Sequence, residues 1–446
     1  MNAVRTVEAM TSARGERGES RATAWGVTFT LVALYVLNYA DKAVLGLVAQ
    51  PLSEELGLTS SQIGLIGSAF FAAFVFSGFF AGALTRWMPM RWIMVILSLT
   101  WAASMLPVVA FAGFAVLLMS RIALGLFEGP SSAIIHTAAY SWHPPQKRGL
   151  PGAFITAGSS IAKIALIPVL AVIVATWGWR GAFIALAILG LAWCAVWLMV
   201  WREGPYGERT ASAEPDEARA TTLPTPNDAP WWRIARTPTF LGGLVAVFAM
   251  YALVSTVLTW LPSYFEVGLG YGRLQAGAMF GLPSIVGVVA MFAATAVSDR
   301  MLSRGASARM LRGVLPGCGL LVCGVALVGL PAISSPVLAV VVVSIGYGVG
   351  SIVFPLINAA ISQICPPHRL ATTLGIFLAL MALGGLVGPY MTGVIVDGAA
   401  SPAEGYAAAF QIFGVLALVG GLAALLGMNP ERDARRVLGP VPAGER

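Results

Sequence analysis

The sequence predicts an all-α membrane protein with 12 transmembrane helices in two six-helix bundles and both termini in the cytoplasm. Three observations predict this fold: the composition, the recurrence of long apolar runs, and the distribution of basic residues. Of the 446 residues, 58% are hydrophobic and only 11% are charged, whereas an average soluble domain is about 25% charged. This composition excludes a water-soluble enzyme and an intrinsically disordered protein.

The apolar runs are separated by charged, proline and glycine clusters. About 20 residues cross a bilayer as a helix, and each run is at least that long. The expected spans are residues 25–48, 60–84, 92–111, 114–138, 150–175, 180–201, 238–264, 273–297, 310–330, 335–363, 370–396 and 405–428.

A polar segment rich in Pro, Glu, Asp and Arg divides these spans six from six. The first 24 residues carry four arginines, and no small-residue cleavage site follows the first apolar run, so we expect an uncleaved cytoplasmic tail. The predicted parts are an N-terminal tail (1–24), a first bundle (25–202), a cytoplasmic linker (203–236), a second bundle (237–428) and a C-terminal tail (429–446).

The basic residues give the orientation. Of 27 Lys and Arg residues, three lie within spans, Arg180 and Arg273 lie outside the cell, and 22 lie on cytoplasmic segments, as the positive-inside rule requires. The net charge of +7 therefore reflects topology and gives no reason to expect a nucleic-acid partner. The scarcity of lysine favours a bacterial source, so we expect a multi-pass protein of a bacterial cytoplasmic (inner) membrane.

Five ionisable residues lie inside predicted spans, all in the first half. They are Asp41 and Lys42 in span 1, Arg121 and Glu128 in span 4, and Lys163 in span 5. Each would cost about 2.5–3.5 kcal/mol at the centre of a lone inserted helix, so they must face a cavity or one another. Three cations against two carboxylates favour binding of an anion, and protonation of the acids would strengthen it. The alternative is a set of structural ion pairs that join spans 1, 4 and 5.

The spacing of these residues suggests some of their partners. Arg121 and Glu128 are two helical turns apart and share a face, whereas Asp41 and Lys42 point about 100° apart and need partners from other spans. Lys163 and Arg121 are the candidates. In the second half, polar residues recur along spans 7 and 10 and either line the cavity or join helices: Tyr251, Ser255, Thr259, Tyr347, Ser351 and Asn358. Asn358 is the best candidate for the cavity.

Five stretches resemble the major facilitator superfamily in the right order and at the right spans: Asn38–Lys42, Ser68–Phe71, Arg121–Glu128, Gly178–Arg180 and Trp260–Tyr264. Within it, the chain is most similar to the anion:cation symporter family, which carries organic and sugar acids, often with protons. The resemblance implies the major facilitator fold. It also implies that Asp41 and Glu128 match protonatable acids, and that Lys42 and Arg121 match positions that hold or gate the substrate carboxylate.

Departures from that family suggest a different substrate body. Lys42 replaces an arginine, and Lys163 stands where relatives tend to have a small residue. Phe74 and Gly78 stand in place of a tyrosine and a glutamine, and Leu378 and Ala382 where asparagine is common. A site that lacks hydrogen-bonding groups favours an apolar body. We therefore expect an apolar or aromatic mono- or dicarboxylate, bound by Lys42, Arg121, Lys163, Tyr35, Asn38, Phe74 and Asn358.

The function that follows is proton-coupled import of an organic anion by alternating access, with Asp41 and Glu128 as the proton-coupling residues. An anion exchanger without proton coupling and a sugar-acid/proton symporter are the alternatives. The sequence shows no metal-type cluster, phosphate loop or nucleophile–base pair, so neither an enzyme nor a cofactor is expected. The expected partners are a small organic-acid anion, protons and the lipid bilayer, with the protein as a monomer.

Overall fold

The computed structural model is built of α-helices, as the composition predicts. It describes residues 2–80, 84–85, 87–144, 148–206, 231–366 and 370–438. Within these ranges, 11 helical segments are long and apolar enough to cross a membrane. The all-helical membrane fold is therefore confirmed.

The chain forms its helices in two successive sets. The first set is α1 (Asn2–Leu56), α2 (Ser60–Gly78), α4 (Met90–Ala110), α5 (Phe114–Glu128), α6 (Ser131–Tyr140), α7 (Gly149–Ile161), the π-helical turn η2 (Ala162–Leu166) and α8 (Ile167–Val200). The second set is α10 (Trp231–Ala235), α11 (Pro238–Ser263), η4 (Tyr264–Gly268), α12 (Arg273–Met279), α13 (Leu282–Leu302), η5 (Met310–Val314), α14 (Leu315–Val328), η6 (Leu330–Ala332), α15 (Pro336–Gly350), α16 (Val353–Ile364), α17 (Leu370–Gly398), α18 (Pro402–Gly427) and α19 (Pro430–Leu438).

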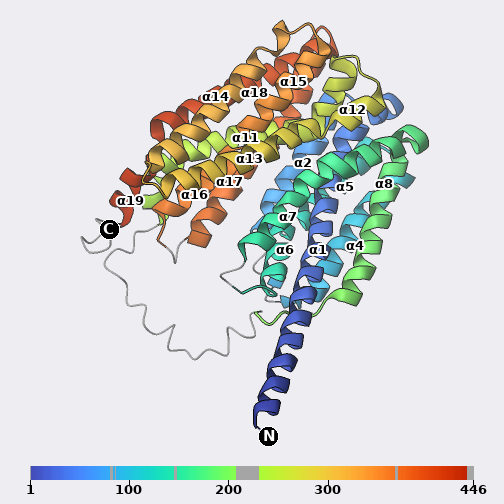
Figure 1. Cartoon of the computed structure of the whole chain (residues 1–446). Helices are drawn as coiled ribbons and strands as arrows, with labels where there is room; N and C mark the ends of the chain where they lie inside the picture. Colours follow the sequence, from blue (N-terminus) through green and yellow to red (C-terminus); the bar gives the residue numbers. More distant parts are fainter. Residues whose placement is uncertain are drawn as a thin grey trace.

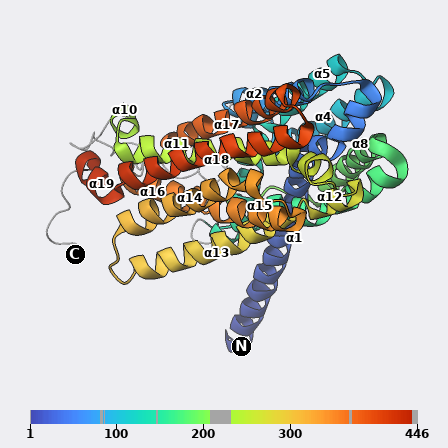
Figure 2. The ribbon, with the colours of Figure 1, turned by 90° about the horizontal axis from the view of Figure 1, so that it is seen from above.

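The two sets form two groups of helices side by side. In Figure 1 the first group, α1 to α8, lies to the right and most of the second group, α10 to α19, to the left, while α12 lies at the upper right beside α8. The view from above separates them in the same way (Figure 2). α12 lies at the end of the molecule opposite the two chain termini (Figure 1).

Some predicted spans are not single continuous helices in the structure: one is divided in two, and two others form one continuous run. Predicted span 114–138 is α5 and α6, which meet at Gly129 and Pro130, where proline removes a backbone donor and clashes with the preceding turn. Residues 150–200 form an unbroken helical run of 51 residues, which consists of α7, η2 and α8 and contains a kink within α8. Its backbone leaves the helical region at Gly178, with φ 75° and ψ 174°. A left-handed φ of this kind favours glycine.

Close backbone contacts at glycines join the two groups at one end. A Cβ on Gly46 would lie 2.3 Å from the carbonyl oxygen of Leu258, and one on Gly64 would lie 2.4 Å from that of Pro389. Only glycine permits such an approach. We call this the closed end; it comprises the part of the first group around Gly46 to Gly64 and the part of the second group around Leu258 and Pro389.

Polar contacts reinforce the closed end. The Asp397 carboxylate at the end of α17 accepts the backbone N–H groups of Ser60 and Ser61, at 2.9 and 2.7 Å. These are unpaired donors of the first turn of α2, where a negative charge also complements the helix dipole. The Arg273 guanidinium pairs with Glu54 at 2.7 Å. Each of these bonds crosses from one group to the other.

The Asp397 contact gives a first prediction. Asp397→Asn keeps the shape but removes the charge, which is expected to weaken the closed end by about 1.5–3 kcal/mol. Spin labels at the exposed positions Trp177 and Leu274, in a background without the native cysteines, should then report longer distances between the groups. Ser401→Ala is the control, because Ser401 caps α18 within the second group alone. A distance distribution identical to wild type would contradict this role for Asp397.

Candidate functional site

A buried ion pair between α1 and α5 forms the centre of the candidate site. Lys42 Nζ lies 3.0 Å from Glu128 Oε2, with side chains that are 6% and 0% exposed. Lys42 also donates to Asn38 Oδ1 one turn earlier on α1. Asn38 Nδ2 donates to Ser131 Oγ at 3.3 Å, and Ser131 Oγ donates to the Glu128 carbonyl at 2.6 Å. These contacts link α1, α5 and α6 in one polar chain, which we call the Lys42–Glu128 chain.

Two aromatic rings flank the cation of this chain. Lys42 Nζ lies 4.8 Å from the ring centre of Tyr39 and 4.9 Å from that of Phe74. A cation over an aromatic face is stabilised by about 0.5–2 kcal/mol, with the larger value for desolvated pairs. Phe74 comes from α2 and Tyr39 from α1, so the ammonium group is held between two apolar surfaces as well as beside a carboxylate.

Arg121 lies close to the Lys42–Glu128 chain but does not join it. Its Nη1 donates to the backbone carbonyl of Asp41 at 2.7 Å, and its Nη2 is enclosed with no hydrogen-bond partner among the described residues. The Phe183 ring centre lies 5.8 Å from its Cζ. The guanidinium therefore retains a buried donor that could bind an anionic group.

The pairing differs in part from what the sequence suggested. Glu128 pairs with Lys42 rather than with Arg121, although Arg121 and Glu128 occupy the same helix. Arg121 was a candidate partner for Asp41, but it bonds the Asp41 carbonyl rather than its carboxylate. Within the described ranges, the Asp41 carboxylate forms no ion pair, although its residue is only 5% exposed.

Glycines on α5 bring the charged helices together. A Cβ on Gly125 would lie 2.3 Å from the Phe70 carbonyl oxygen, and one on Gly129 would lie 2.1 Å from Ser77 Oγ. The two glycines are four residues apart and lie on one face of the chain. Their close contact presses α5 onto α2 and so places Glu128 and Phe74 around Lys42.

Lys163 lies apart from the other ionisable residues. It is 9% exposed and belongs to the π-helical turn η2. Neither a hydrogen bond nor an ion pair joins its side chain to the part of the chain that the structure describes. The sequence-based suggestion that Lys163 pairs with an acid of span 1 is therefore not what the structure shows.

Tyrosines of both groups gather beside the cluster. The rings of Tyr35 and Tyr39 are 5.3 Å apart. Tyr251 of α11 lies within electrostatic reach of Tyr35 and of Glu128, and Tyr347 of α15 lies within reach of Tyr251. The second group therefore faces the buried charges with phenol hydroxyls rather than with charges of its own.

Polar residues of the second half were expected either to line the cavity or to join helices, and the structure gives examples of both arrangements. Ser255 and Thr259 are buried where α11 meets Gly388 and Gly67, so they lie in contacts between helices. Asn358 on α16 has an enclosed Oδ1 without a hydrogen-bond partner among the described residues. An unsatisfied buried polar atom costs about 1–3 kcal/mol, and such a group is a candidate for contact with a ligand.

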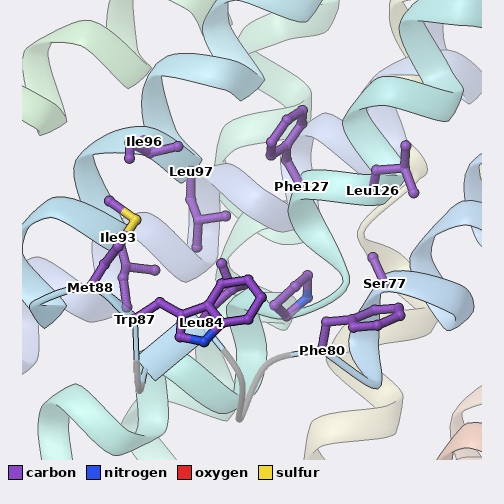
Figure 3. Close-up of a pocket in the computed structure, with 11 residues that line it drawn as sticks. Ser77, Phe80, Leu84, Trp87, Met88, Ile93, Ile96, Leu97, Leu126 and Phe127 are labelled. Carbon is purple, nitrogen blue, oxygen red and sulfur yellow. The ribbon is translucent and has the colours of Figure 1, made fainter.

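A separate cavity of about 310 Å³ lies between α2, α4 and α5. Figure 3 shows its lining, which is apolar except for Ser77. The lining residues are Ser77, Phe80, Leu84, Trp87, Met88, Ile93, Ile96, Leu97, Leu126, Phe127 and Pro130. Because none of them carries a charge, this cavity is not suited to an organic anion. Metal-type clusters of His, Cys, Asp and Glu are absent from the described ranges.

The sequence profile described as Major Facilitator Superfamily matches residues 31–389 and 312–443. The chain belongs to the Major Facilitator Superfamily. This confirms the resemblance drawn from the five motifs and shows that the protein is a membrane transporter and not an enzyme. The fold also agrees: a bacterial homolog of the human lysosomal transporter Spinster, solved in an inward-facing, unoccupied conformation, superimposes with a TM-score of 0.77 at 18% identity, over 94% of this chain and 99% of that one.

Two superfamily relatives are similar over nearly their full length. The chain is 27% identical to the D-galactonate transporter of Escherichia coli O6:H1, over 92% of this chain and 96% of that protein. It is also 27% identical to the hexuronate transporter of Bacillus subtilis, over 92% of this chain and 94% of that protein. These relatives are consistent with the anion:cation symporter branch of the superfamily.

Sequence reasoning missed two residues of the site. Tyr39 lies three residues before Lys42 and so shares its helix face, a spacing that could have indicated the contact. Ser131 gives no such signal, because its position depends on the break between α5 and α6.

The buried ion pair gives a second prediction. Lys42→Met leaves Glu128 charged and unpaired and is expected to destabilise the protein by about 3–5 kcal/mol. The double variant Lys42→Met/Glu128→Gln removes both charges and should recover most of that loss. Thermal unfolding of the purified proteins in detergent measures the difference. A double variant as unstable as Lys42→Met would show that the pair is not the source of the stability.

Proposed function

We propose that this superfamily member imports a small organic anion together with protons across a bacterial cytoplasmic membrane. The observation that carries the proposal is the buried cluster of Lys42, Arg121, Asp41 and Glu128. It combines a guanidinium with a donor that has no partner among the described residues, a cation that a proton on Glu128 would release, and the Asp41 carboxylate, which forms no ion pair within the same ranges. The two relatives described above transport sugar-acid anions by name, which supports an organic anion as substrate.

The proposed topology is 12 crossings with both termini in the cytoplasm. The segment of residues 150–200 is far longer than a bilayer of about 30 Å requires, and its break at Gly178 supports two crossings there. The parts of the chain are then 1–24, 25–202, 203–236, 237–428 and 429–446, as the sequence suggests. In this orientation the closed end lies outside the cell, so the structure is inward-facing. We propose a monomer.

In the proposed cycle, protons and substrate bind in the same step. Protonation of Glu128 and Asp41 leaves Lys42 and Arg121 without compensating charge, and the anion takes the place of the carboxylates. The two groups then rock about the site, and the substrate and protons leave to the cytoplasm. Because linkage is reciprocal, a substrate that binds more tightly to the protonated protein also raises its affinity for protons.

The surroundings of the cations support an apolar or aromatic body for the substrate. Tyr39 and Phe74 flank Lys42, and Tyr35 adds a further ring on α1. The proposed contacts are Lys42, Arg121, Lys163, Tyr35, Asn38, Phe74 and Asn358. A sugar acid is the second candidate, favoured by the names of the relatives and by the tyrosine hydroxyls that could bind a polyol. An exchanger would use the same cations without proton movement.

Uptake into proteoliposomes tests the coupling and the substrate together. Vesicles loaded with a pH-sensitive dye are challenged with aromatic and aliphatic mono- and dicarboxylates and with sugar acids. We expect the interior to acidify with carboxylates that carry an apolar body, and not in vesicles without protein. Counterflow of an anion without any pH change would show exchange instead, and acidification by sugar acids alone would overturn the proposed substrate class.

A variant isolates the role of Glu128. Glu128→Gln cannot bind and release a proton, so it is expected to retain anion counterflow while losing uphill uptake driven by a pH gradient. Both are measured with labelled anion in the same vesicles. Ser132→Ala is the matched control, because Ser132 lies on α6 close to Glu128 in the chain and carries no ionisable group. Full uphill uptake by Glu128→Gln would remove this residue from the coupling step.

A further inference from the structure

Lys163 is a buried cation that the Lys42–Glu128 chain leaves without a partner. The residue is 9% exposed, and no carboxylate of the described residues lies within ion-pair distance of it. Its Nζ is not among the fully enclosed unpartnered polar atoms of the described residues, which include Arg121 Nη2 and Asn358 Oδ1. The ammonium group therefore touches an accessible space while most of the side chain is enclosed.

The backbone around Lys163 is modified locally. Residues 162–166 form a π-helical turn between α7 and α8, and the Ile167 N–H donates to the Ala162 carbonyl, five residues back. An extra residue in one turn rotates the following residues by about 100° relative to an uninterrupted α-helix. Such turns are uncommon and occur often at functional sites. This turn allows α7 and α8 to present different faces to the same neighbours.

The same turn lies where the two groups of helices meet. A Cβ on Gly281, between α12 and α13, would lie 2.8 Å from the Lys163 carbonyl oxygen and 2.9 Å from Ile164 Cα. η2 also packs against α1, the helix that carries Lys42. The Lys163 side chain therefore begins at the junction between the groups, beside the helix that contributes to the anion site.

We infer that Lys163 forms a second anion subsite and that the transported substrate is an organic dianion. This inference rests on the proposed function and specifies its substrate class. One anionic group of the substrate binds Arg121 and Lys42, and the other pairs with Lys163. A single ammonium group is a point charge without a bidentate fork, so the second group can be a carboxylate or a sulfonate. Because the cations come from α1, α5 and η2, an extended dianion fits better than a compact one.

A dianion accounts for a lysine that no group of the described residues neutralises. A monoanion held by Arg121 and Lys42 would leave Lys163 unpaired within the membrane-spanning part of the protein. A lysine in a membrane-spanning helix can extend its amine towards the membrane surface. Lys163 is 91% buried by protein, so its side chain is not extended in this way. A second negative charge on the substrate would pair with it only while substrate is bound.

The test compares matched substrates that differ by one charge. Labelled terephthalate and benzoate form one pair, and glutarate and butyrate form another. In wild-type proteoliposomes each dianion should have a KM lower than its monoanion by about tenfold to a hundredfold, as expected for one charge-assisted contact. Lys163→Met should raise the KM for the dianion to that for the monoanion, so that the preference between the members of each pair is lost. Lys163→Arg should restore the preference.

Ile161→Met is the matched control, because Ile161 ends α7 two residues before Lys163 and is exposed. Thermal unfolding of the purified Lys163→Met protein in detergent shows whether the variant is folded. If Lys163→Met does not reconstitute, Lys163→Gln replaces it. An unchanged dianion preference in the variant overturns the inference, as does a wild-type protein that takes up both members of each pair equally; the proposed function stands in both cases. Absence of uptake and counterflow for every anion contradicts the proposed function itself.

Discussion

The architecture of the first group depends on the burial of an ion pair in a membrane. Lys42 and Glu128 lie on different helices, and neither charge is tolerated there without the other. Their meeting requires α5 to approach α2 through Gly125 and Gly129, and it requires α5 to end at Glu128, before Pro130, so that Ser131 can reach the Glu128 carbonyl. The two glycines, the break between α5 and α6 and the Lys42–Glu128 chain therefore all help to bring the two opposite charges together.

Charge is distributed unequally between the two groups. Lys42, Glu128, Arg121 and Lys163 all belong to the first group, whereas the second brings the hydroxyl of Tyr251 within electrostatic reach of Glu128. Contacts across the junction are of a different kind, since they include glycine-mediated backbone packing, the bonds of Asp397 and Arg273, and the part-buried bonds from Gln50 to Tyr406 and from Tyr390 to Ser68. A rocking motion can therefore break the junction without separating the buried ion pair. In the proposed site, the charged side chains come from the first group, and the second group covers them.

Composition and apolar runs were sufficient to predict the helical membrane fold, because hydrocarbon leaves few alternatives to helices. The burial of Asp41, Arg121, Glu128 and Lys163 also followed from their positions within apolar runs. The partners of these charged residues could not be predicted in the same way. The spacing of Arg121 and Glu128 shows that they share a face, but it cannot show which neighbouring helix lies against that face. The π-helical turn at Lys163 and the break between α5 and α6 depend on packing, and no local pattern specifies the first of them.

In the proposed cycle, a surplus of buried positive charge would make transport respond to the membrane voltage. Three formal cations and two carboxylates leave one net positive charge in the first group when both acids are ionised. Moving one elementary charge through the full membrane potential involves about 2.3 kcal/mol per 100 mV. If rocking shifts the cluster through part of that field, return of the empty carrier is electrogenic. In the proposed cycle both acids are protonated when a dianion is bound, so the three cations and the two negative charges of the substrate again leave one net positive charge on the loaded carrier.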